Sequence, residues 1–180
     1  KRIGLETDAW MLKSSDYLRL TSTLPDAALV DASGIVEQGR MIKSPQELQY
    51  MRQAARAAEA GMKAGLEAVR EGVVENELAA EVHRAQLLAG SEYTGLPVFI
   101  TSGARSLLVH ATWSSKAVGA NEVVFFEVPG SINRYHAAMT RTAYVGDPPA
   151  SLLRAMETSA DALSLAKAAI KPGVPAATAF

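Results

Sequence analysis

The segment from Ser44 to Gly72 constrains the fold most. Ser44 can cap a helix, Pro45 suits the first helical position, and Glu47 completes a capping box. Apolar residues then recur every three or four positions, as expected on one face of a helix. They are Leu48, Met51, Ala55, Ala58, Met62, Leu66 and Val69. This pattern predicts a long amphipathic helix with one buried stripe, which ends at Gly72.

The rest of the chain alternates helical patterns with short apolar runs. A second helix is expected over residues 76–89, with Leu78, Val82, Ala85 and Leu88 inward. Strands are expected at 98–100, 123–128 and 137–145. A last helix is expected over 150–170, with its inward stripe at Leu153, Met156, Ala160, Leu163 and Ile170. These elements predict an α+β fold.

Residues 1–40 differ from the remainder. They contain two short apolar runs, at 3–5 and 28–30, and a short helical segment at 14–20. We interpret them as the end of a preceding α/β domain, with a second domain over 41–180. Because the chain opens on Lys1 and stops at Phe180 where another helix begins, we expect a fragment of a longer protein. Helix ends at Gly72 and Gly173 lie in similar contexts about a hundred residues apart, which indicates a weak internal repeat.

Composition excludes several classes of function. The formal net charge is −1 over 180 residues, so the strong basic field that non-specific nucleic-acid binding requires is absent. The sequence has no cysteine, which excludes a disulfide scaffold, a thiolate zinc site and a cysteine nucleophile. Apolar runs fall well short of the ~20 residues of a membrane span. We expect a cytoplasmic protein with neither a nucleic-acid nor a membrane partner.

Glu127 is the most informative polar residue. Strand alternation places it on one face with Val123 and Phe125, and neither face of this apolar run is expected to be solvated. A carboxylate there must pair, bind a ligand or take up a proton. It is a candidate base or nucleophile, and the structural alternative is an ion pair with Arg134 or Arg141.

The three histidines have different expected roles. His83 lies off the apolar stripe of its helix and is expected to be solvated. His110 follows a buried strand in a loop, where catalytic groups concentrate, although a loop histidine bonded to a carbonyl fits equally well. His136 shares a strand face with Arg134 and Ala138, and it either faces a pocket with Glu127 or sits on an edge strand. Near His110, Trp113 either walls a pocket or packs in the core.

These landmarks, in their order along the chain, resemble the creatinase/prolidase/aminopeptidase P superfamily. They are residues 42–47, Ser102-Gly103 with His110 downstream, the strand at Glu127, and Thr140-Arg141-Thr142. The resemblance covers roughly residues 40–180. It implies a pita-bread fold, present here as the first half with the start of the second, and a homodimer. The two related halves of that fold also account for the repeat.

The resemblance further implies which branch of the superfamily applies. Metal-dependent members place an aspartate at Glu127 and another at the position of Ala138, whose methyl group cannot bind a metal. The sequence therefore looks like the metal-free branch that includes creatinase, with no cofactor. There the histidine that matches His110 performs acid–base chemistry on a small C–N substrate.

Within that branch, residues 126–128, 134–137 and 140–142 look most like ectoine hydrolases. The resemblance implies opening of the cyclic amidine of ectoine to N-acetyl-diaminobutyrate. Glu127 would pair with the cationic ring and either attack it or orient water, and His110 would pass a proton to the leaving nitrogen. Trp113, Tyr135, His136 and Arg141 are expected to bind the substrate.

Three alternatives remain open at this stage. A creatinase-type amidinohydrolase would equally place a carboxylate against a guanidinium. A metal-dependent Xaa-Pro peptidase is disfavoured by Ala138. A non-catalytic pita-bread binding module, as in some histone chaperone subunits, is disfavoured by the presence of both His110 and Glu127.

Overall fold

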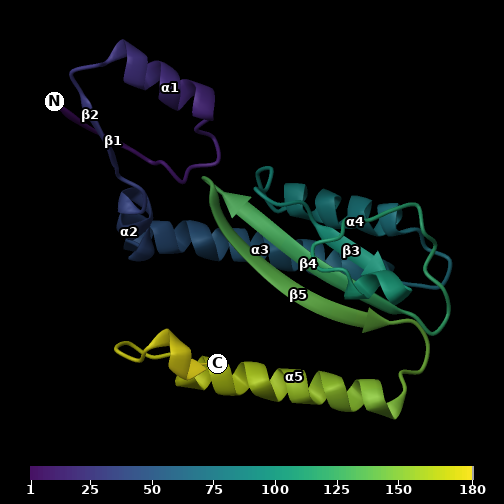
Figure 1. The fold of residues 1–180 in the computed structure, drawn as a ribbon. Coiled ribbons are helices and arrows are strands. Elements are labelled where there is room, and N and C mark those ends of the chain that lie inside the picture. The colour runs from purple at the N-terminus through teal and green to yellow at the C-terminus, as the bar shows by residue number, and fades with distance from the viewer. Residues whose placement is uncertain (180) are drawn as a thin grey trace. The chain divides into compact units, whose positions relative to one another are not determined.

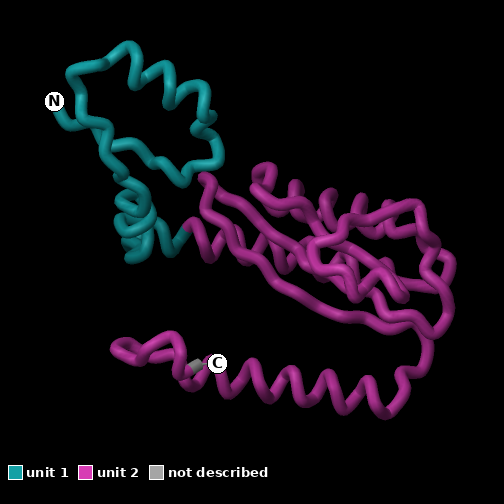
Figure 2. Tube along the Cα trace, viewed as in Figure 1, with its two compact units in different colours: residues 1–49 teal, residues 50–180 magenta. Residues whose placement is uncertain are grey.

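A computed structural model describes residues 1–179 of the chain (Figure 1). The chain forms two compact units, residues 1–49 and the residues from 50 onward (Figure 2). Helix α3 (Pro45–Ala68) begins in the first unit and continues into the second. The domain boundary expected near residue 40 stays a prediction.

The first unit is a small β–α–β arrangement. Strands β1 (Arg2–Leu5) and β2 (Ala28–Asp31) pair in parallel, and helix α1 (Ser14–Thr23) connects them. The predicted strands and helix are confirmed, each slightly longer than expected. Helix α2 (Ile35–Met41) was not predicted, because its seven residues are too few to show a helical period.

The predicted capping box at the start of α3 is present. The Ser44 amide donates to Glu47 Oε2 at 2.6 Å, and the Glu47 amide donates to Ser44 Oγ at 3.3 Å. The buried face, however, differs from the expected stripe and consists mostly of small residues. It comprises Ala54, Ala57, Ala58, Gly61, Met62 and Gly65. The prediction was right in part, since Ala58 and Met62 are buried and Leu66 and Val69 pack against the core. It missed the glycines and alanines through which this face approaches its neighbours closely.

The second unit contains an antiparallel sheet of order β3-β4-β5. Its strands are β3 (Phe99–Ser102), β4 (Val123–Ile132) and β5 (Tyr135–Tyr144). Strand β4 extends beyond its predicted end and pairs with β5 as far as Ile132, and Gly130 lets it approach α3 along this stretch. A Cβ on Gly130 would lie 2.2 Å from the Ala54 carbonyl oxygen.

Helix α4 (Glu75–Leu88) packs with α3 on one face of this sheet. Its Leu78 and Val82 join Phe126 of β4 in the buried core. The inward position predicted for Leu88 is wrong, since that residue is 75% exposed. Gln86 is buried instead and donates to the Pro129 carbonyl, so a polar residue with a partner occupies the apolar face.

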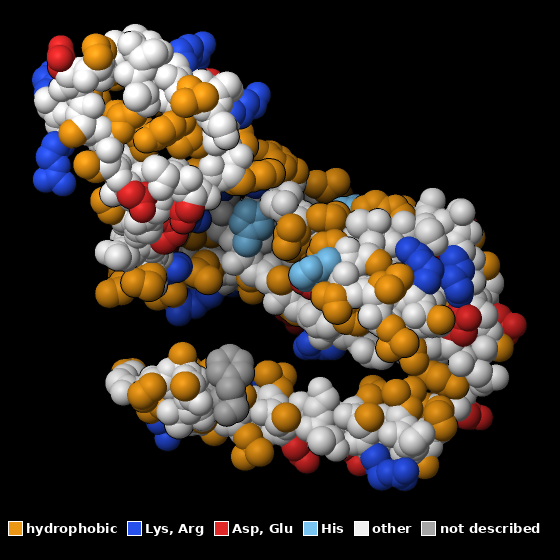
Figure 3. Space-filling model, in the orientation of Figure 1, with side chains coloured by type: hydrophobic (Ala, Val, Ile, Leu, Met, Phe, Trp, Pro, Cys, Tyr) orange, Lys and Arg blue, Asp and Glu red, His pale blue; other side chains and the backbone are white. Residues whose placement is uncertain are grey.

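Helix α5 (Ala150–Ala169) follows the sheet and leads to the short 3₁₀ turn η2 (Ala176–Ala179). Its predicted inward stripe is wrong for the structure described, since Leu163 is 60% exposed and Ile170 67%. Figure 3 shows hydrophobic side chains at the surface of this helix. The weak internal repeat expected from the sequence has a local counterpart in the structure. Gly72 and Gly173 both adopt a left-handed backbone, with φ of 81° and 83°. In the described part of the chain, no helix is long and apolar enough to cross a membrane.

Candidate active site

Glu127 lies in the middle of β4, between Phe99 of β3 and Thr140 of β5. Its neighbours Phe126 and Val128 point into the core that α3 and α4 cover. Alternation therefore places the Glu127 side chain on the opposite face of the sheet. That side chain is 24% exposed. The Glu127 side chain is thus mostly buried but remains partly accessible to solvent.

His110 reaches Glu127 from the loop that follows β3. Its Nε2 lies 4.0 Å from Glu127 Oε2. The ring also packs beside Phe99, with centroids 5.0 Å apart. His110 has a φ of 58°, a left-handed conformation that side chains other than glycine adopt uncommonly. Backbone strain of this kind clusters at functional sites.

The pair is close but not hydrogen bonded, since 4.0 Å exceeds hydrogen-bond distance. Within residues 1–179 the Glu127 carboxylate accepts no other hydrogen bond, and neither Arg134 nor Arg141 forms an ion pair with it. Arg134 pairs with Glu92 instead. The structural ion pair considered for Glu127 is therefore absent from the described residues. An imidazole and a carboxylate with free lone pairs face the same space, as acid–base chemistry requires.

His136 lies on the same face as Glu127 but farther along the hairpin. Its partner in the register is Ser131, four residues from Glu127 and so roughly 13 Å along β4. The Gly95 amide donates to His136 Nε2 at 3.0 Å, so this nitrogen is the acceptor. The other nitrogen, Nδ1, then donates to the Arg134 carbonyl at 3.0 Å. Both ring nitrogens therefore have backbone partners, and these contacts fit the tautomer that carries a proton on Nδ1.

The other three predicted substrate-binding residues lie elsewhere in the second unit. Trp113 packs against the core and meets the His83 ring edge-on, with centroids 5.5 Å apart. Tyr135 lies beside Tyr50 of α3, with centroids 5.6 Å apart. Arg141 pairs with Phe126 in the register, on the opposite side of the sheet from Glu127, and donates to the Thr140 carbonyl. Their role in binding stays a prediction.

His83 is not the solvated histidine that its helix position predicted. It is half-buried against Trp113. Burial lowers its pKa, and a hydrogen bond with Gln86 opposes this only in part. His83 is therefore neutral near pH 7 and packs as an aromatic residue.

Glu75, at the start of α4, is a second important carboxylate that the sequence pattern did not single out. It is fully buried and accepts hydrogen bonds from Ser102, Arg105 and Ser114. Burial alone would raise its pKa, but the hydrogen bonds from Ser114, Ser102 and Arg105 outweigh that effect and lower it. A glutamate in a first helical turn is ordinarily a dipole or capping residue, so no local pattern distinguishes this one.

A second ionic contact lies next to Glu75. Lys116 donates to Glu122 Oε2 at 2.5 Å and to Ser102 Oγ at 2.9 Å. The Lys116 hydrogen bond, with that of the Gly119 amide, lowers the pKa of Glu122. Both carboxylates are therefore ionised at neutral pH and hold the segment that contains His110.

The residues that the structure describes do not assemble a metal centre by themselves. No group of three or more histidine, cysteine, aspartate or glutamate side chains gathers within residues 1–179. On the Glu127 face, the nearest register partners on β5 are Thr140 and Ala138, and a methyl group offers no donor. One carboxylate and one imidazole do not fit a two-metal site, so we derive no step through a metal.

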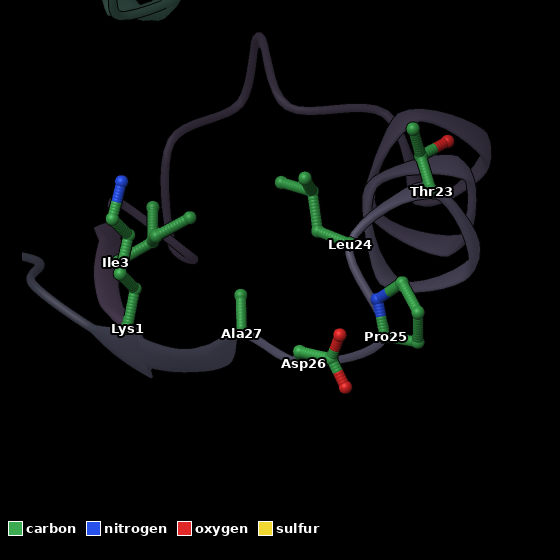
Figure 4. Close-up of a pocket in the computed structure, with 7 residues that line it drawn as sticks. All are labelled: Lys1, Ile3, Thr23, Leu24, Pro25, Asp26 and Ala27. Atoms are coloured by element: carbon green, nitrogen blue, oxygen red, sulfur yellow. The ribbon is translucent and has the colours of Figure 1, made fainter.

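A separate pocket lies in the first unit (Figure 4). It has a volume of about 270 Å³ and is lined by Lys1, Ile3 and residues 23–27. Ile3, Leu24 and Ala27 turn carbon atoms toward the hollow. No histidine lines this pocket, whereas His110 and Glu127 both belong to the second unit.

Comparison with known proteins agrees with this geometry. The model of metallopeptidase family M24 matches residues 49–179. The chain belongs to metallopeptidase family M24. The fold predicted from the sequence, a partial pita-bread domain, is confirmed by its M24 neighbours. The X-Pro aminopeptidase of Thermotoga maritima superimposes with a TM-score of 0.85 at 26% identity, over 92% of this chain and 46% of that one.

Two M24 relatives differ in the reactions their names give. The chain is 32% identical to the ectoine hydrolase of Halomonas elongata, over 95% of this chain and 45% of the relative. It is 30% identical to the Xaa-Pro dipeptidase of Pyrococcus furiosus, over 79% of this chain and 41% of the relative. The chain spans less than half the length of these relatives. Both are hydrolases, as is the family, and they leave the choice of substrate open.

Proposed function

We propose that this M24 chain forms part of the active site of a metal-independent hydrolase that opens the cyclic amidine ring of ectoine. The observation that supports the proposal is the His110–Glu127 pair, 4.0 Å apart with the carboxylate otherwise unpartnered in the described residues. The similarity to the ectoine hydrolase of Halomonas elongata adds to it. Ala138, close to Glu127 on the same sheet face, favours metal independence because it removes a donor.

In the proposed reaction, Glu127 recognises the charge of the substrate. A protonated amidine carries a positive charge spread over two nitrogens, and a partly shielded carboxylate attracts it more strongly than one in bulk water. The amidine carbon is then open to attack, either by Glu127 Oε2 or by a water that Glu127 orients. Addition of water to this carbon gives a tetrahedral centre with two nitrogens. If Glu127 attacks first, one ring nitrogen leaves from the adduct, and water then cleaves the bond between the carbon and Glu127, which restores the carboxylate.

His110 then completes the hydrolysis. An atom off the line between Nε2 and Oε2 can lie about 2.9 Å from both, because the two are only 4.0 Å apart. His110 can therefore take a proton from the attacking water and give it to the departing nitrogen. Cleavage of that C–N bond leaves one nitrogen as an acetamide and the other as a free amine. The net reaction consumes one water and produces N-acetyl-diaminobutyrate.

The test uses the full-length protein after treatment with a chelator. Ectoine is added, and the ring and acetyl signals are followed by proton NMR. Appearance of the acetyl-diaminobutyrate product in the presence of chelator supports both the substrate and the metal independence. An unchanged spectrum, together with turnover of an Xaa-Pro dipeptide on addition of Mn²⁺, would overturn the proposal in favour of a peptidase. Creatine serves as a third substrate for the amidinohydrolase alternative.

The homodimer implied by the resemblance stays a prediction. Light scattering of the full-length protein measures its mass directly, and a monomeric mass would contradict it.

A further inference from the structure

Glu75 has an unusually complete set of hydrogen bonds for a carboxylate that touches neither Glu127 nor His110. One oxygen accepts from the Ser102 amide at 2.8 Å and the Ser102 hydroxyl at 2.9 Å. The other accepts from the Ser114 amide at 2.9 Å, the Ser114 hydroxyl at 2.8 Å, and Arg105. None of the Glu75 side chain is exposed. Both carboxylate oxygens of Glu75 are therefore fully occupied as hydrogen-bond acceptors.

These partners lie at the two ends of one segment. Ser102 ends β3 and Arg105 lies in the following 3₁₀ turn η1 (Gly103–Leu107), while Ser114 belongs to the returning chain. The Glu75 amide also donates to the Lys116 carbonyl at 3.0 Å. His110 is near the middle of this segment, residues 102–116. Glu75 thus closes the base of the loop whose tip presents the histidine.

Arg105 extends this contact toward His110. Its Nη1 reaches Glu75 and donates to Ser114 Oγ at 2.7 Å, and its Nη2 donates to the Thr112 carbonyl at 2.9 Å. Thr112 is only two residues from His110. A planar guanidinium held by an ionised carboxylate therefore fixes a backbone carbonyl next to the catalytic residue.

The tip of the loop has little packing of its own. Leu107 and Val109 are each 83% exposed, and the His110 side chain is 61% exposed. Its one ring contact in the described residues is with Phe99. Because the tip is weakly packed and His110 has a left-handed backbone, its position must be set from the two ends of the loop.

We propose that Glu75 is a positioning residue, which sets the distance and direction of His110 relative to Glu127 through Ser102, Ser114 and Arg105. This inference rests on the proposed function for the catalytic roles of His110 and Glu127. The geometric part of it, the placement of the His110 ring, does not depend on the substrate.

The experiment compares Glu75→Gln with Glu77→Gln in the full-length protein. Glu77 undergoes the same chemical change two residues along α4, and its carboxylate caps the helix by accepting from the Val74 amide without touching the loop. Imidazole signals of His110 are observed by ¹⁵N and ¹³C NMR and assigned with His110→Asn. Glu75→Gln should shift and broaden the His110 signals and leave those of His83 and His136 in place. Glu77→Gln should leave all three unchanged.

Turnover gives the second measurement. With ectoine as substrate, Glu75→Gln should lower kcat at least tenfold while KM changes less than threefold, since the Glu127 face is untouched. If Glu75→Gln does not fold, Ser114→Ala removes one of the five hydrogen bonds and should produce the same shifts at smaller size. Unchanged His110 signals and kcat in a folded variant would overturn the positioning role. Absence of ectoine turnover in the unmodified protein would instead overturn the proposed function, while the NMR comparison still tests the positioning.

Discussion

Two glutamates of the second unit illustrate opposite uses of a carboxylate. Glu75 is fully buried and accepts five hydrogen bonds from three residues. Glu127 is 24% exposed, and its Oε2 lies 4.0 Å from His110 Nε2. Both lie within reach of the same loop. A buried charge whose lone pairs are all used contributes to structure, whereas one whose lone pairs are free is available to a ligand.

The comparison predicts that substitution of Glu127 lowers activity with little change in stability, whereas substitution of Glu75 lowers stability as well. Glu127→Gln should lower the turnover of the full-length protein about 100-fold or more, because the variant has no negative charge for the cationic substrate and no base or nucleophile. Its free energy of unfolding should change by less than about 1 kcal/mol, since no protein hydrogen bond is lost. Steady-state kinetics and urea unfolding measure the two quantities. Loss of several kcal/mol of stability would show instead that Glu127 has a structural partner.

Glu75→Ala should produce the opposite result in urea unfolding. Removal of the carboxylate leaves Arg105 and the buried groups of Ser102 and Ser114 without their acceptor, which we expect to cost about 3 kcal/mol at pH 7. The folded state lowers the pKa of Glu75, so its charge contributes stability above its unfolded pKa of about 4.3. That contribution is lost as pH falls through the lower, folded pKa.

The pH dependence therefore gives a second check on Glu75. The difference in unfolding free energy between the unmodified protein and Glu75→Ala should be constant above about pH 5 and shrink below about pH 4. Glu77→Gln is the control, and its difference should stay small throughout. A difference that grew toward acid pH would show that the folded state raises the pKa of Glu75, and that its hydrogen bonds do not compensate for burial.

The sequence predicted the elements better than their buried faces. Caps and strand runs are local, and so the helix at Pro45 and the strand around Glu127 were found. The face of α3 was predicted only in part, because Gly61 and Gly65, which a hydrophobic count ignores, allow Gln86, Val82 and Phe126 to approach. The stripe of α5 was predicted from its own period, but a stripe becomes buried only where another element covers it.

The candidate site shows the same difference between features that depend on local sequence and features that depend on contacts with distant residues. Strand alternation gave the faces within each strand, because the period of a strand is local. That Glu127 and His136 share a face follows from the register of β4 with β5, and His136 also lies on the edge strand that was the alternative interpretation. The approach of His110 depends on a loop conformation with φ of 58°, which no pattern in the sequence encodes. Glu75 was missed because its partners lie 27 to 39 residues away. Contacts over such separations are set by the fold and not by neighbouring residues.

Thr101 allows a test with a smaller expected effect, which compares a buried hydroxyl that has no hydrogen-bond partner with one that has partners. It is fully buried in β3, and in the described part of the chain its Oγ1 has no hydrogen-bond partner. The next residue, Ser102, is equally buried, but its hydroxyl contacts Glu75 and Lys116. Thr101→Val removes an unsatisfied hydroxyl while keeping the shape, and should raise the free energy of unfolding by about 1 kcal/mol.

Ser102→Ala, the matched variant, should lower the free energy of unfolding by about 1–2 kcal/mol, because it removes a donor from Glu75 and an acceptor from Lys116. Opposite signs at adjacent buried positions would show that the partner, and not the burial, decides what a polar group contributes. Thr101 pairs with Phe125 in the register and so belongs to the Glu127 face. If Thr101→Val proved destabilising in the full-length protein, the hydroxyl would have a partner outside residues 1–179, and this face would be covered in the complete molecule.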